Sequence, residues 1–378
     1  MLKFFKKKNS TQDLSRAEDV RPGGGFHKLK VSDIRRETPD CVSVAFSIPD
    51  ELKEDFRFLQ GQYLTFKKEI KGEEVRRSYS VCSSPVDGEL RVAIKEVEGG
   101  RFSTYANREL KVGDTLEAMT PRGNFYRPLD ENRKAEYVAF ASGSGITPVM
   151  SILKTTLEKE DNSRFILFYG NRNTGSIIFR NELDDLKNRF MGRLEVHHVL
   201  SREDQGTDLL KGRLDEEKCR GFADRFFEPA EVEAYYLCGP GEMIGNISET
   251  LQSLGAPKDR ILFELFSSPG AAKVEGKKES GKKEKFMAEV TVILDEDETH
   301  FQIGSDGKSV LDAALDAGAD VPFACKGAVC CTCRAKVLEG KAEMDMNYAL
   351  EDDEVDEGYV LTCQAHPRSE RVVISYDE

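Results

Sequence analysis

The stretch ACKGAVCCTCRAKV, residues 324–337, places four of the chain's nine cysteines within nine residues. Cys325, Cys330 and Cys333 follow the pattern C-x4-C-x2-C, and 29 residues separate Cys333 from Cys363. Nine is an odd number, and the N-terminal MLKFFKKKNS lacks the apolar segment and cleavage site of a signal peptide, so a disulfide framework is not expected. The pattern instead predicts metal binding or redox chemistry in a cytoplasmic protein.

The spacing is typical of a [2Fe–2S] cluster, in which a tight loop supplies three thiolates and a distant cysteine supplies the fourth. Gly327 and Ala328 fit such a loop, because small residues let backbone N–H groups approach the bridging sulfides. A zinc site is the alternative, but structural zinc sites usually pair two short C-x2-C knuckles, and the second is missing from this sequence. Cys331 lies between ligand positions and is expected to be a free thiol.

The whole segment 287–378 resembles the plant-type ferredoxins. In that family the first two cysteines of the motif bind one iron, and the third binds the other iron together with the distant cysteine. The resemblance therefore assigns Cys325 and Cys330 to one iron, and Cys333 and Cys363 to the second. With a predicted hairpin (AEVTVIL and THFQIG), a helix (SVLDAALDAG) and a closing strand (RVVISY), the segment is expected to form an α+β, β-grasp-like domain.

Acidic side chains are concentrated in this same segment. Residues 287–378 hold 21 Asp and Glu against 7 Lys and Arg, a balance of −14, whereas the other 286 residues balance at +1. An acidic module joined to a nearly neutral body argues against a nucleic-acid ligand and favours a protein partner with a basic docking face. The acidic residues could equally serve only to keep the module soluble.

The rest of the chain divides by composition. Residues 1–25 are expected to form a basic tail, although its lysines could instead touch anionic lipid. Residues 267–286, rich in Lys, Gly, Ser and Glu, are expected to form a flexible linker. Residues 26–132 contain short alternating stretches such as QYLTFKKEI and ELRVAIKEV between turn residues, which favours an antiparallel β-barrel. No apolar run approaches the roughly 18 residues that a membrane-spanning helix needs.

Apolar strands alternate with helical periods over residues 133–266. The predicted strands are YVAFA (137–141), RFILFYG (164–170), RLEVHHVL (193–200), AYYLCG (234–239) and RILFEL (260–265). The predicted helices are VMSILKTTLEKE, NELDDLKNRF and EMIGNISETLQSL. This alternation predicts a doubly wound α/β domain with a parallel sheet, which binds its ligand at the carboxyl ends of the strands.

RRSYS at 76–80 ends a predicted barrel strand and is similar to the R-x-Y-S flavin motif of the ferredoxin–NADP reductase superfamily. Arg77 can neutralise a pyrophosphate, Tyr79 can pack on the flavin, and Ser80 can hydrogen-bond the ring near its reactive nitrogen. VAIK, GGRFSTYAN and PRGNF follow in the order expected of that superfamily. They add to the FAD site Ile94, Lys95, Gly100, Phe102, Ser103 and Thr104, the last two at a helix N-terminus that can receive phosphate.

SGSGITP at 142–148 follows a predicted strand and opens a helix, where glycines allow close approach of a pyrophosphate. Together with YGNR and CGPGEM, which end two later strands, it resembles the nicotinamide-binding half of the same superfamily. The site residues expected from these motifs are Gly143, Gly145, Thr147, Cys238, Gly239 and Pro240. The resemblance places Thr147 beside the flavin and Cys238 near the nicotinamide, although Cys238 could be a buried structural thiol.

Two further features bear on the nicotinamide nucleotide. Ser201 and Arg202 follow the third strand, where they can bind a 2′-phosphate, so NADPH is favoured over NADH; Arg172 can assist or remain solvated. Phe266 resembles the aromatic residue that covers the flavin in relatives and is displaced by nicotinamide, but it could equally pack in the core. Ser80, Cys238 and Phe266 are the expected catalytic residues.

The order of flavin barrel, nicotinamide domain, linker and ferredoxin is similar to reductase components of multicomponent oxygenases. Within that group, FHKLKVSDIRRETPDCVSVAFSIP, GQYLTF, GEEVRRSYSVCSSP and VLTCQAHP resemble reductase subunits of ring-1,2-phenylacetyl-CoA epoxidases, which serve phenylacetate catabolism. The resemblance implies an oxidoreductase that passes electrons from NADPH through FAD and the [2Fe–2S] cluster to an oxygenase or epoxidase. The alternatives are a reductase of another diiron oxygenase, hydroxylase or fatty-acyl desaturase, and a non-enzymatic iron–sulfur or zinc redox sensor or adaptor.

Overall fold

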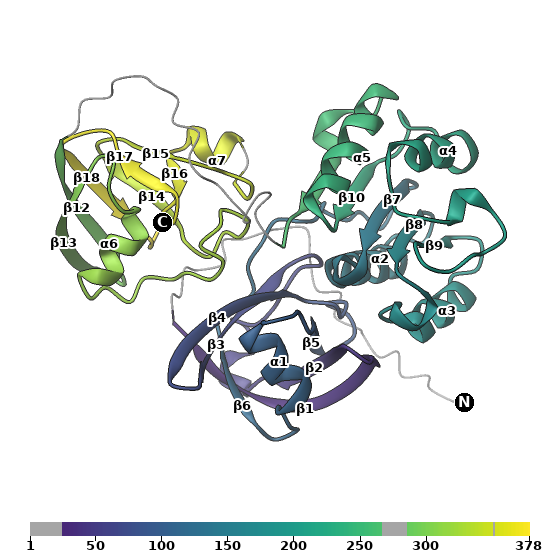
Figure 1. Ribbon diagram of the computed structural model, residues 1–378, viewed down its shortest axis with the longest axis horizontal. Coiled ribbons are helices and arrows are strands. Elements are labelled where there is room, and N and C mark those ends of the chain that lie inside the picture. The colour runs from purple at the N-terminus through teal and green to yellow at the C-terminus, as the bar shows by residue number, and fades with distance from the viewer. Residues whose placement is uncertain (1–24, 267–285, 351) are drawn as a thin grey trace, which may run out of the picture.

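The computed structural model describes residues 25–266, 286–350 and 352–378, which form three bodies (Figure 1). The predicted basic tail and linker lie outside the described residues, apart from Gly25 and Phe286. Phe286, the last residue of the predicted linker, packs against the core of the third body, and its carbonyl accepts a hydrogen bond from the Ser305 amide at 2.9 Å. The predicted limits of the three domains each enclose one main sheet.

The first body is an antiparallel β-barrel of six strands in the order β4-β3-β6-β1-β2-β5. Its elements are β1 (His27–Thr38), β2 (Cys41–Ser47), η1 (Asp50–Leu52), β3 (Tyr63–Ile70), β4 (Glu73–Ser80), β5 (Leu90–Lys95), α1 (Arg101–Arg108) and β6 (Thr115–Ala118). A bridge between Val81 and Val92 joins the end of β4 to β5 and closes the sheet. Strand β6 was not predicted, because its four residues, TLEA, carry too short an alternation to stand out.

Alternating apolar residues fill the barrel. Leu64 and Phe66 on β3 are fully buried, and Val42 and Val44 on β2 have at most 1% of their surface exposed. The rings of Phe46 and Phe102 stack on Phe66 at centroid distances of 5.2 and 6.0 Å. Phe102 comes from α1, so this contact fixes the helix across the barrel beside β4.

The second body is a five-stranded parallel sheet in the order β11-β10-β7-β8-β9. Its strands are β7 (Glu136–Ser142), β8 (Arg164–Asn171), β9 (Leu194–Leu200), β10 (Ala234–Cys238) and β11 (Ile261–Glu264). Its helices are η2 (Gly143–Gly145), α2 (Ile146–Lys159), η3 (Thr174–Ser176), α3 (Arg180–Arg189), η4 (Asp208–Leu210), α4 (Glu216–Phe226), α5 (Gly241–Ser253) and η5 (Lys258–Arg260). The predicted doubly wound fold and all five predicted strands are confirmed.

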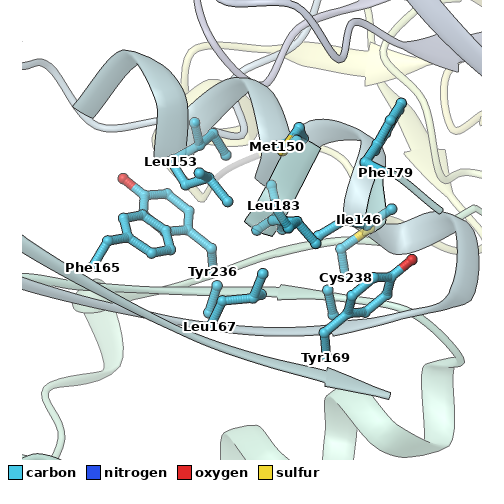
Figure 2. Close-up of a cluster of buried hydrophobic side chains, with 14 of the residues drawn as sticks. Ile146, Met150, Leu153, Phe165, Leu167, Tyr169, Phe179, Leu183, Tyr236 and Cys238 are labelled. Carbon is cyan, nitrogen blue, oxygen red and sulfur yellow. The ribbon is translucent and has the colours of Figure 1, made fainter. Parts of the chain in front are cut away.

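The helices cover both faces of this sheet, because alternate residues of each strand point to opposite sides. Tyr137, Phe165 and Tyr236 pack with α2 and α3 on one face, and Figure 2 labels Phe165 and Tyr236 there. Phe140 and Phe168 pack with α4 and α5 on the other face. Helix α4 was not predicted. Its sequence EEKCRGFADRF has a central glycine and few apolar residues, and its start is fixed by Asp215, which accepts a hydrogen bond from the Lys218 amide.

The third body is a mixed sheet in the order β13-β12-β18-β14-β16, with a separate β15-β17 pair. Its elements are β12 (Met287–Leu294), β13 (Asp297–Gly304), α6 (Val310–Asp316), β14 (Arg334–Glu339), β15 (Ala342–Met344), α7 (Asp352–Asp356), β16 (Tyr359–Leu361), β17 (Ala365–Pro367) and β18 (Arg371–Ser375). The predicted hairpin, helix and closing strand are β12–β13, α6 and β18, so the α+β architecture is confirmed. Among the described residues of the whole chain, no helix has both the length and the apolar composition needed to cross a membrane.

A glycine sets the path of the chain into β3. Gly61 has φ +85°, and a Cβ atom there would lie 2.1 Å from the Phe125 carbonyl oxygen. Gly61→Ala is therefore expected to lower the free energy of unfolding by about 2–4 kcal/mol, through backbone strain and a clash with the main chain. Urea unfolding followed by circular dichroism measures this change.

Gly72→Ala is the matched control for that substitution. Gly72 has a similar φ of +78°, but nothing lies within 4 Å of its added Cβ. The control should lose only about 1 kcal/mol, from strain alone. Equal losses in the two variants would show that the contact with Phe125 contributes nothing.

Candidate functional site

A cavity of about 640 Å³ lies where the three bodies meet. The barrel lines it with Tyr63, Arg77, Ser78, Tyr79, Ser80, Ala93, Lys95, Val97, Gly100, Arg101, Phe102 and Ser103. The α/β body contributes Ser144, Thr147, Glu264, Leu265 and Phe266, and the third body contributes Ala324, Cys325, Lys326, Gly327, Val329, Cys330 and Met346. One space is therefore bounded by the R-x-Y-S strand, by the start of α2 and by the cysteine loop.

The structure brings nine of the predicted cofactor-binding residues together around this cavity. They are Arg77, Tyr79, Ser80, Lys95, Gly100, Phe102, Ser103, Thr147 and Phe266. Ile94 is fully buried in the barrel core instead, and the side chain of Phe266 is 44% exposed rather than packed in the core. Thr104 lies on α1 outside the lining.

The barrel side of the cavity combines charge, aromatic surface and hydroxyl groups. Arg77 is exposed and is held by a hydrogen bond from Nη1 to the Arg76 carbonyl at 2.6 Å. The ring of Tyr79 packs against Phe102 at a centroid distance of 5.5 Å. Gly100 precedes α1, where a Cβ would lie 2.4 Å from the Ser103 hydroxyl oxygen. A guanidinium, an aromatic ring and a helix start suit a ligand with a flat ring system and a pyrophosphate.

A partly buried carboxyl group, that of Glu264, faces Ser80, and no sequence motif predicted it. The Ser80 hydroxyl donates to Glu264 Oε2 at 2.9 Å, across the junction between barrel and α/β body. Burial raises the pKa of Glu264 to about 7, and the Ser80 hydrogen bond opposes that shift. A signal was available in FELF, because an acid in an apolar tetrapeptide at the carboxyl end of a strand is unusual.

Cys238 lies beneath the cavity and does not line it. It is fully buried and packs with Ile146 and Tyr169 in the cluster of Figure 2. Burial, with the nearby Glu264 carboxyl, raises the pKa of its thiol. Gly145 is held against it, because an added Cβ there would lie 2.1 Å from the Cys238 carbonyl oxygen. The backbone thus needs glycine at this point, while the role of Cys238 toward a nicotinamide stays a prediction.

The remaining predicted nucleotide-binding residues gather at the carboxyl edge of the parallel sheet. Gly143 follows β7, Arg172 follows β8, Ser201 and Arg202 follow β9, and Gly239 and Pro240 follow β10. The Arg202 amide donates to the Arg172 carbonyl at 2.8 Å, so the two exposed arginines adjoin. The Glu203 carboxylate accepts from the Thr174 amide at 2.7 Å and from the Thr174 hydroxyl at 2.6 Å.

The four motif cysteines form two close pairs. The sulfur atoms of Cys330 and Cys325 are 3.2 Å apart, and Cys333 is hydrogen-bonded to Cys363. The Cys330 thiol and the Gly327, Val329 and Cys330 amides lower the pKa of Cys325 by hydrogen bonding. Lys326 and Ala328 have φ values of +51° and +62°, which turn the loop around these sulfurs.

This arrangement fits a two-iron cluster. The pairs are those expected when each iron takes two thiolates, and amides aimed at the sulfurs favour thiolate over thiol. Within the described residues, no three His, Cys, Asp or Glu side chains gather closely enough to hold a single ion. Cys331 stands apart, with its sulfur 3.2 Å from the Ala349 carbonyl oxygen.

Comparison with known protein families matches each body separately. Residues 28–126 match an oxidoreductase FAD-binding domain, residues 140–249 an oxidoreductase NAD-binding domain, and residues 292–368 a 2Fe-2S iron-sulfur cluster binding domain. The FAD, nicotinamide and [2Fe–2S] assignments made from the motifs are thereby confirmed.

Several curated relatives match over nearly the whole chain. A 1,2-phenylacetyl-CoA epoxidase subunit from Escherichia coli (strain K12) is 44% identical over 353 residues, covering 93% of this chain and 98% of its own. The chain belongs to the family of iron–sulfur flavoprotein reductases that contains this relative. The ferredoxin reductase component of a 3-ketosteroid-9-alpha-monooxygenase from Rhodococcus rhodochrous is 33% identical and covers 92% of this chain and 96% of its own.

Solved structures of related architecture support the fold. A phthalate dioxygenase reductase aligns with a TM-score of 0.55 at 23% identity, over 94% of this chain and 99% of its own. An intact type IV self-sufficient cytochrome P450 monooxygenase gives a TM-score of 0.67 at 23% identity, over 92% of this chain and 41% of its own. This iron–sulfur flavoprotein reductase is an NAD(P)H-dependent oxidoreductase, not a non-enzymatic sensor.

Glu264 predicts a pH dependence of stability. Burial raises its pKa from 4.5 to about 7, so the stability it contributes is fully present below pH 4.5 and is lost as the pH rises through 7. Relative to Glu264→Gln, the wild-type protein should lose up to about 3 kcal/mol of unfolding free energy between pH 4.5 and pH 8. Urea unfolding at several pH values measures the difference.

The control for this prediction is Glu249→Gln, which changes an exposed carboxylate on α5. Its stability should follow the wild-type protein at every pH. If Glu264→Gln also runs parallel to the wild-type protein, the burial of that carboxyl has no energetic consequence.

Proposed function

We propose that this reductase transfers electrons from NADPH, through FAD and a [2Fe–2S] cluster, to the oxygenase component of a phenylacetyl-CoA epoxidase in the cytoplasm. The observation that carries the electron route is the shared cavity, because Cys325 and Cys330 line the same space as Arg77, Tyr79 and Ser80. The choice of oxygenase rests on the 44% identity to the epoxidase relative. None of the nine cysteines, all of which lie in the described residues, forms a disulfide, which suits a reducing compartment.

Different residues around the cavity would bind the flavin and the iron–sulfur cluster. When bound, the flavin accepts two electrons from the nicotinamide and the cluster accepts one at a time. Arg77 and the start of α1 would neutralise the pyrophosphate, and Tyr79 would pack on the ring. Ser80, tied to Glu264, would hydrogen-bond the ring system near its reactive atom. Cys325, Cys330, Cys333 and Cys363 would hold the irons.

The position of Phe266 supports a role as a gate between the flavin and the nicotinamide. This residue is half exposed at the mouth of the cavity and directly follows Leu265, which also lines it. An aromatic ring here would cover the flavin and would leave when the nicotinamide arrives. Gly143, Gly145, Cys238, Gly239 and Pro240 would form the floor and edge of the nicotinamide site.

The residues at the carboxyl edge of the parallel sheet favour NADPH over NADH. The backbone of Arg202 adjoins that of Arg172, so both arginines and Ser201 would be available to a 2′-phosphate at this edge. Both acids of this segment already have partners: Glu203 accepts from Thr174, and Asp204 accepts from Lys211 and from the Gly206 amide. A site that prefers NADH would normally present an acid to the ribose hydroxyl.

The electron route is tested by removing one cluster ligand. Cys363→Ser should reduce the [2Fe–2S] content and lower NADPH-dependent cytochrome c reduction by at least about tenfold, because the one-electron carrier is lost. Reduction of ferricyanide, which can accept electrons directly from the flavin, should persist. Iron and sulfide analysis and two steady-state assays provide the measurements.

Cys331→Ser is the matched control, since Cys331 neighbours the cluster ligands but belongs to neither sulfur pair. It should retain both activities. A wild-type protein whose flavin and cluster absorption do not bleach with NADPH, in the presence of both groups, would refute the proposed route.

Coenzyme choice is tested at the sheet edge. Arg202→Ala should raise the KM for NADPH by about tenfold, because a charge-assisted contact to the 2′-phosphate is removed, and should leave the KM for NADH nearly unchanged. Steady-state ferricyanide reduction with each nucleotide gives both values. Arg220→Ala, on the exposed side of α4, is the control. Equal changes for the two nucleotides would contradict the 2′-phosphate assignment.

A further inference from the structure

The third body touches the barrel through a small set of polar contacts on β3 and β4. Tyr63, Thr65 and Arg76 supply the barrel side, and the segment 320–332, which contains the cysteine loop, supplies the other. None of these contacts is needed to form the flavin side of the cavity. They determine instead where the cysteine loop lies relative to it.

Tyr63 touches both the cavity and the cysteine loop. Its ring lines the cavity and packs with Ala324 and Cys330. Its hydroxyl oxygen accepts a hydrogen bond from the Cys331 amide at 3.0 Å and lies 3.4 Å from the Thr332 hydroxyl. A single side chain of the barrel therefore fixes the backbone between two cluster ligands.

Thr65, two residues after Tyr63 on β3, makes a second contact with the third body. The hydroxyl oxygens of Thr65 and Thr332 are 3.2 Å apart, and Thr65 is also 2.9 Å from the hydroxyl oxygen of Ser78 on β4. Thr332 is completely buried, and the hydroxyls of Tyr63 and Thr65 are its hydrogen-bonding partners on the barrel.

Arg76 makes the charged contact. Its side chain is 5% exposed, and it donates to Asp320 at 2.9 Å and to Glu74 on its own strand at 2.8 Å. Its guanidinium lies over the ring of Phe323 in the third body at 4.4 Å and over Phe26 at 5.1 Å. Asp320 is 77% exposed, so one end of this ion pair is open to solvent.

These contacts can break without leaving a buried charge unpaired. If the third body moved away, Arg76 would keep Glu74 and Phe26, Thr65 would keep Ser78, and Asp320 would gain water. Separation therefore avoids the large penalty of an isolated buried charge. The same contacts, when formed, restrict the cysteine loop to one position beside the cavity.

We propose that Arg76, Tyr63 and Thr65 form a reversible clamp that docks the cysteine loop on the flavin cavity for electron transfer and releases it for delivery. The proposal rests on the proposed function and adds to it the residues that control docking. In the docked state these residues would hold the cysteine loop beside the flavin side of the cavity, where one electron would pass from reduced flavin to oxidised cluster. Arg76 and Tyr63 act as positioning residues, because they set the distance over which that electron moves.

The test compares Arg76→Gln and Asp320→Asn with the wild-type holoprotein. Stopped-flow mixing with NADPH should show flavin reduction at the wild-type rate in both variants, followed by cluster reduction slowed by about tenfold, because the docked fraction falls. High salt should slow the wild-type second phase and leave it unchanged in Arg76→Gln, since salt screens the charged pair. Tyr63→Phe should slow the same phase, because the hydroxyl that holds the Cys331 amide is removed.

Hydrogen exchange supplies a measurement that does not depend on turnover. In the wild-type holoprotein the amides of residues 320–334 should be protected, and they should exchange about tenfold faster in Arg76→Gln and Tyr63→Phe, because docking no longer shields them. Arg57→Gln is the matched control: it removes an exposed barrel arginine that is paired with Glu54 and not with the third body. Flavin and iron content of every variant shows that the protein has folded.

The possible results distinguish failure of the clamp from failure of the proposed function. Slower cluster reduction and faster exchange in Arg76→Gln and Asp320→Asn, but not in Arg57→Gln, would support the clamp. If the wild-type cluster bleaches with NADPH and these variants match it in both measurements, the clamp is wrong while the proposed function stands. If the wild-type cluster never bleaches, the proposed function fails and the clamp fails with it.

Discussion

Two groups that exchange an electron must lie close together, and in this reductase that closeness depends on one wall of the cavity. Tyr63 forms part of this wall, with its ring toward Ala324 and Cys330 and its hydroxyl on the Cys331 amide. The barrel holds Tyr63 through β3, and the α/β body closes the same cavity with Thr147, Glu264 and Phe266. Each body therefore contributes to one site, although each has its own hydrophobic core.

Local patterns in the sequence predicted much of this site. The cysteine spacing and the R-x-Y-S motif are both short enough to be seen in one stretch. The role of Glu264 was not predicted, because its partner Ser80 lies 184 residues away and no local pattern reveals that contact. The sequence also could not show that the two adjacent arginines of RRSYS, Arg76 and Arg77, have different roles. Because successive side chains of a strand point to opposite faces, Arg77 faces the cavity and Arg76 faces the third body.

Local signal also explains which elements were found. Long periodic segments such as α2 were predicted because Val149, Ile152, Leu153 and Leu157 all point into the core. Helix α4 and the short strands β6, β15, β16 and β17 have no comparable period, and tertiary contacts determine them. Contacts between the barrel and the third body, including the Arg76–Asp320 pair, join residues more than 200 positions apart, so composition and spacing do not reveal them.

The two junctions of the barrel differ in kind, and the difference indicates which body moves. Barrel residues Cys41, Cys82, Ala93 and Phe125 share one buried cluster with α2, and the buried Ser151 hydroxyl donates to the Ser83 carbonyl at 2.6 Å. Separating these bodies would expose a continuous core. The third body instead meets the barrel through hydroxyls, one ion pair and the small cluster of Tyr63, Ala324 and Cys330, and meets the α/β body through Val329 and Tyr348. This difference supports the proposed clamp: a shared core joins the barrel to the α/β body, whereas the cysteine-bearing body is held by contacts that can open at lower cost.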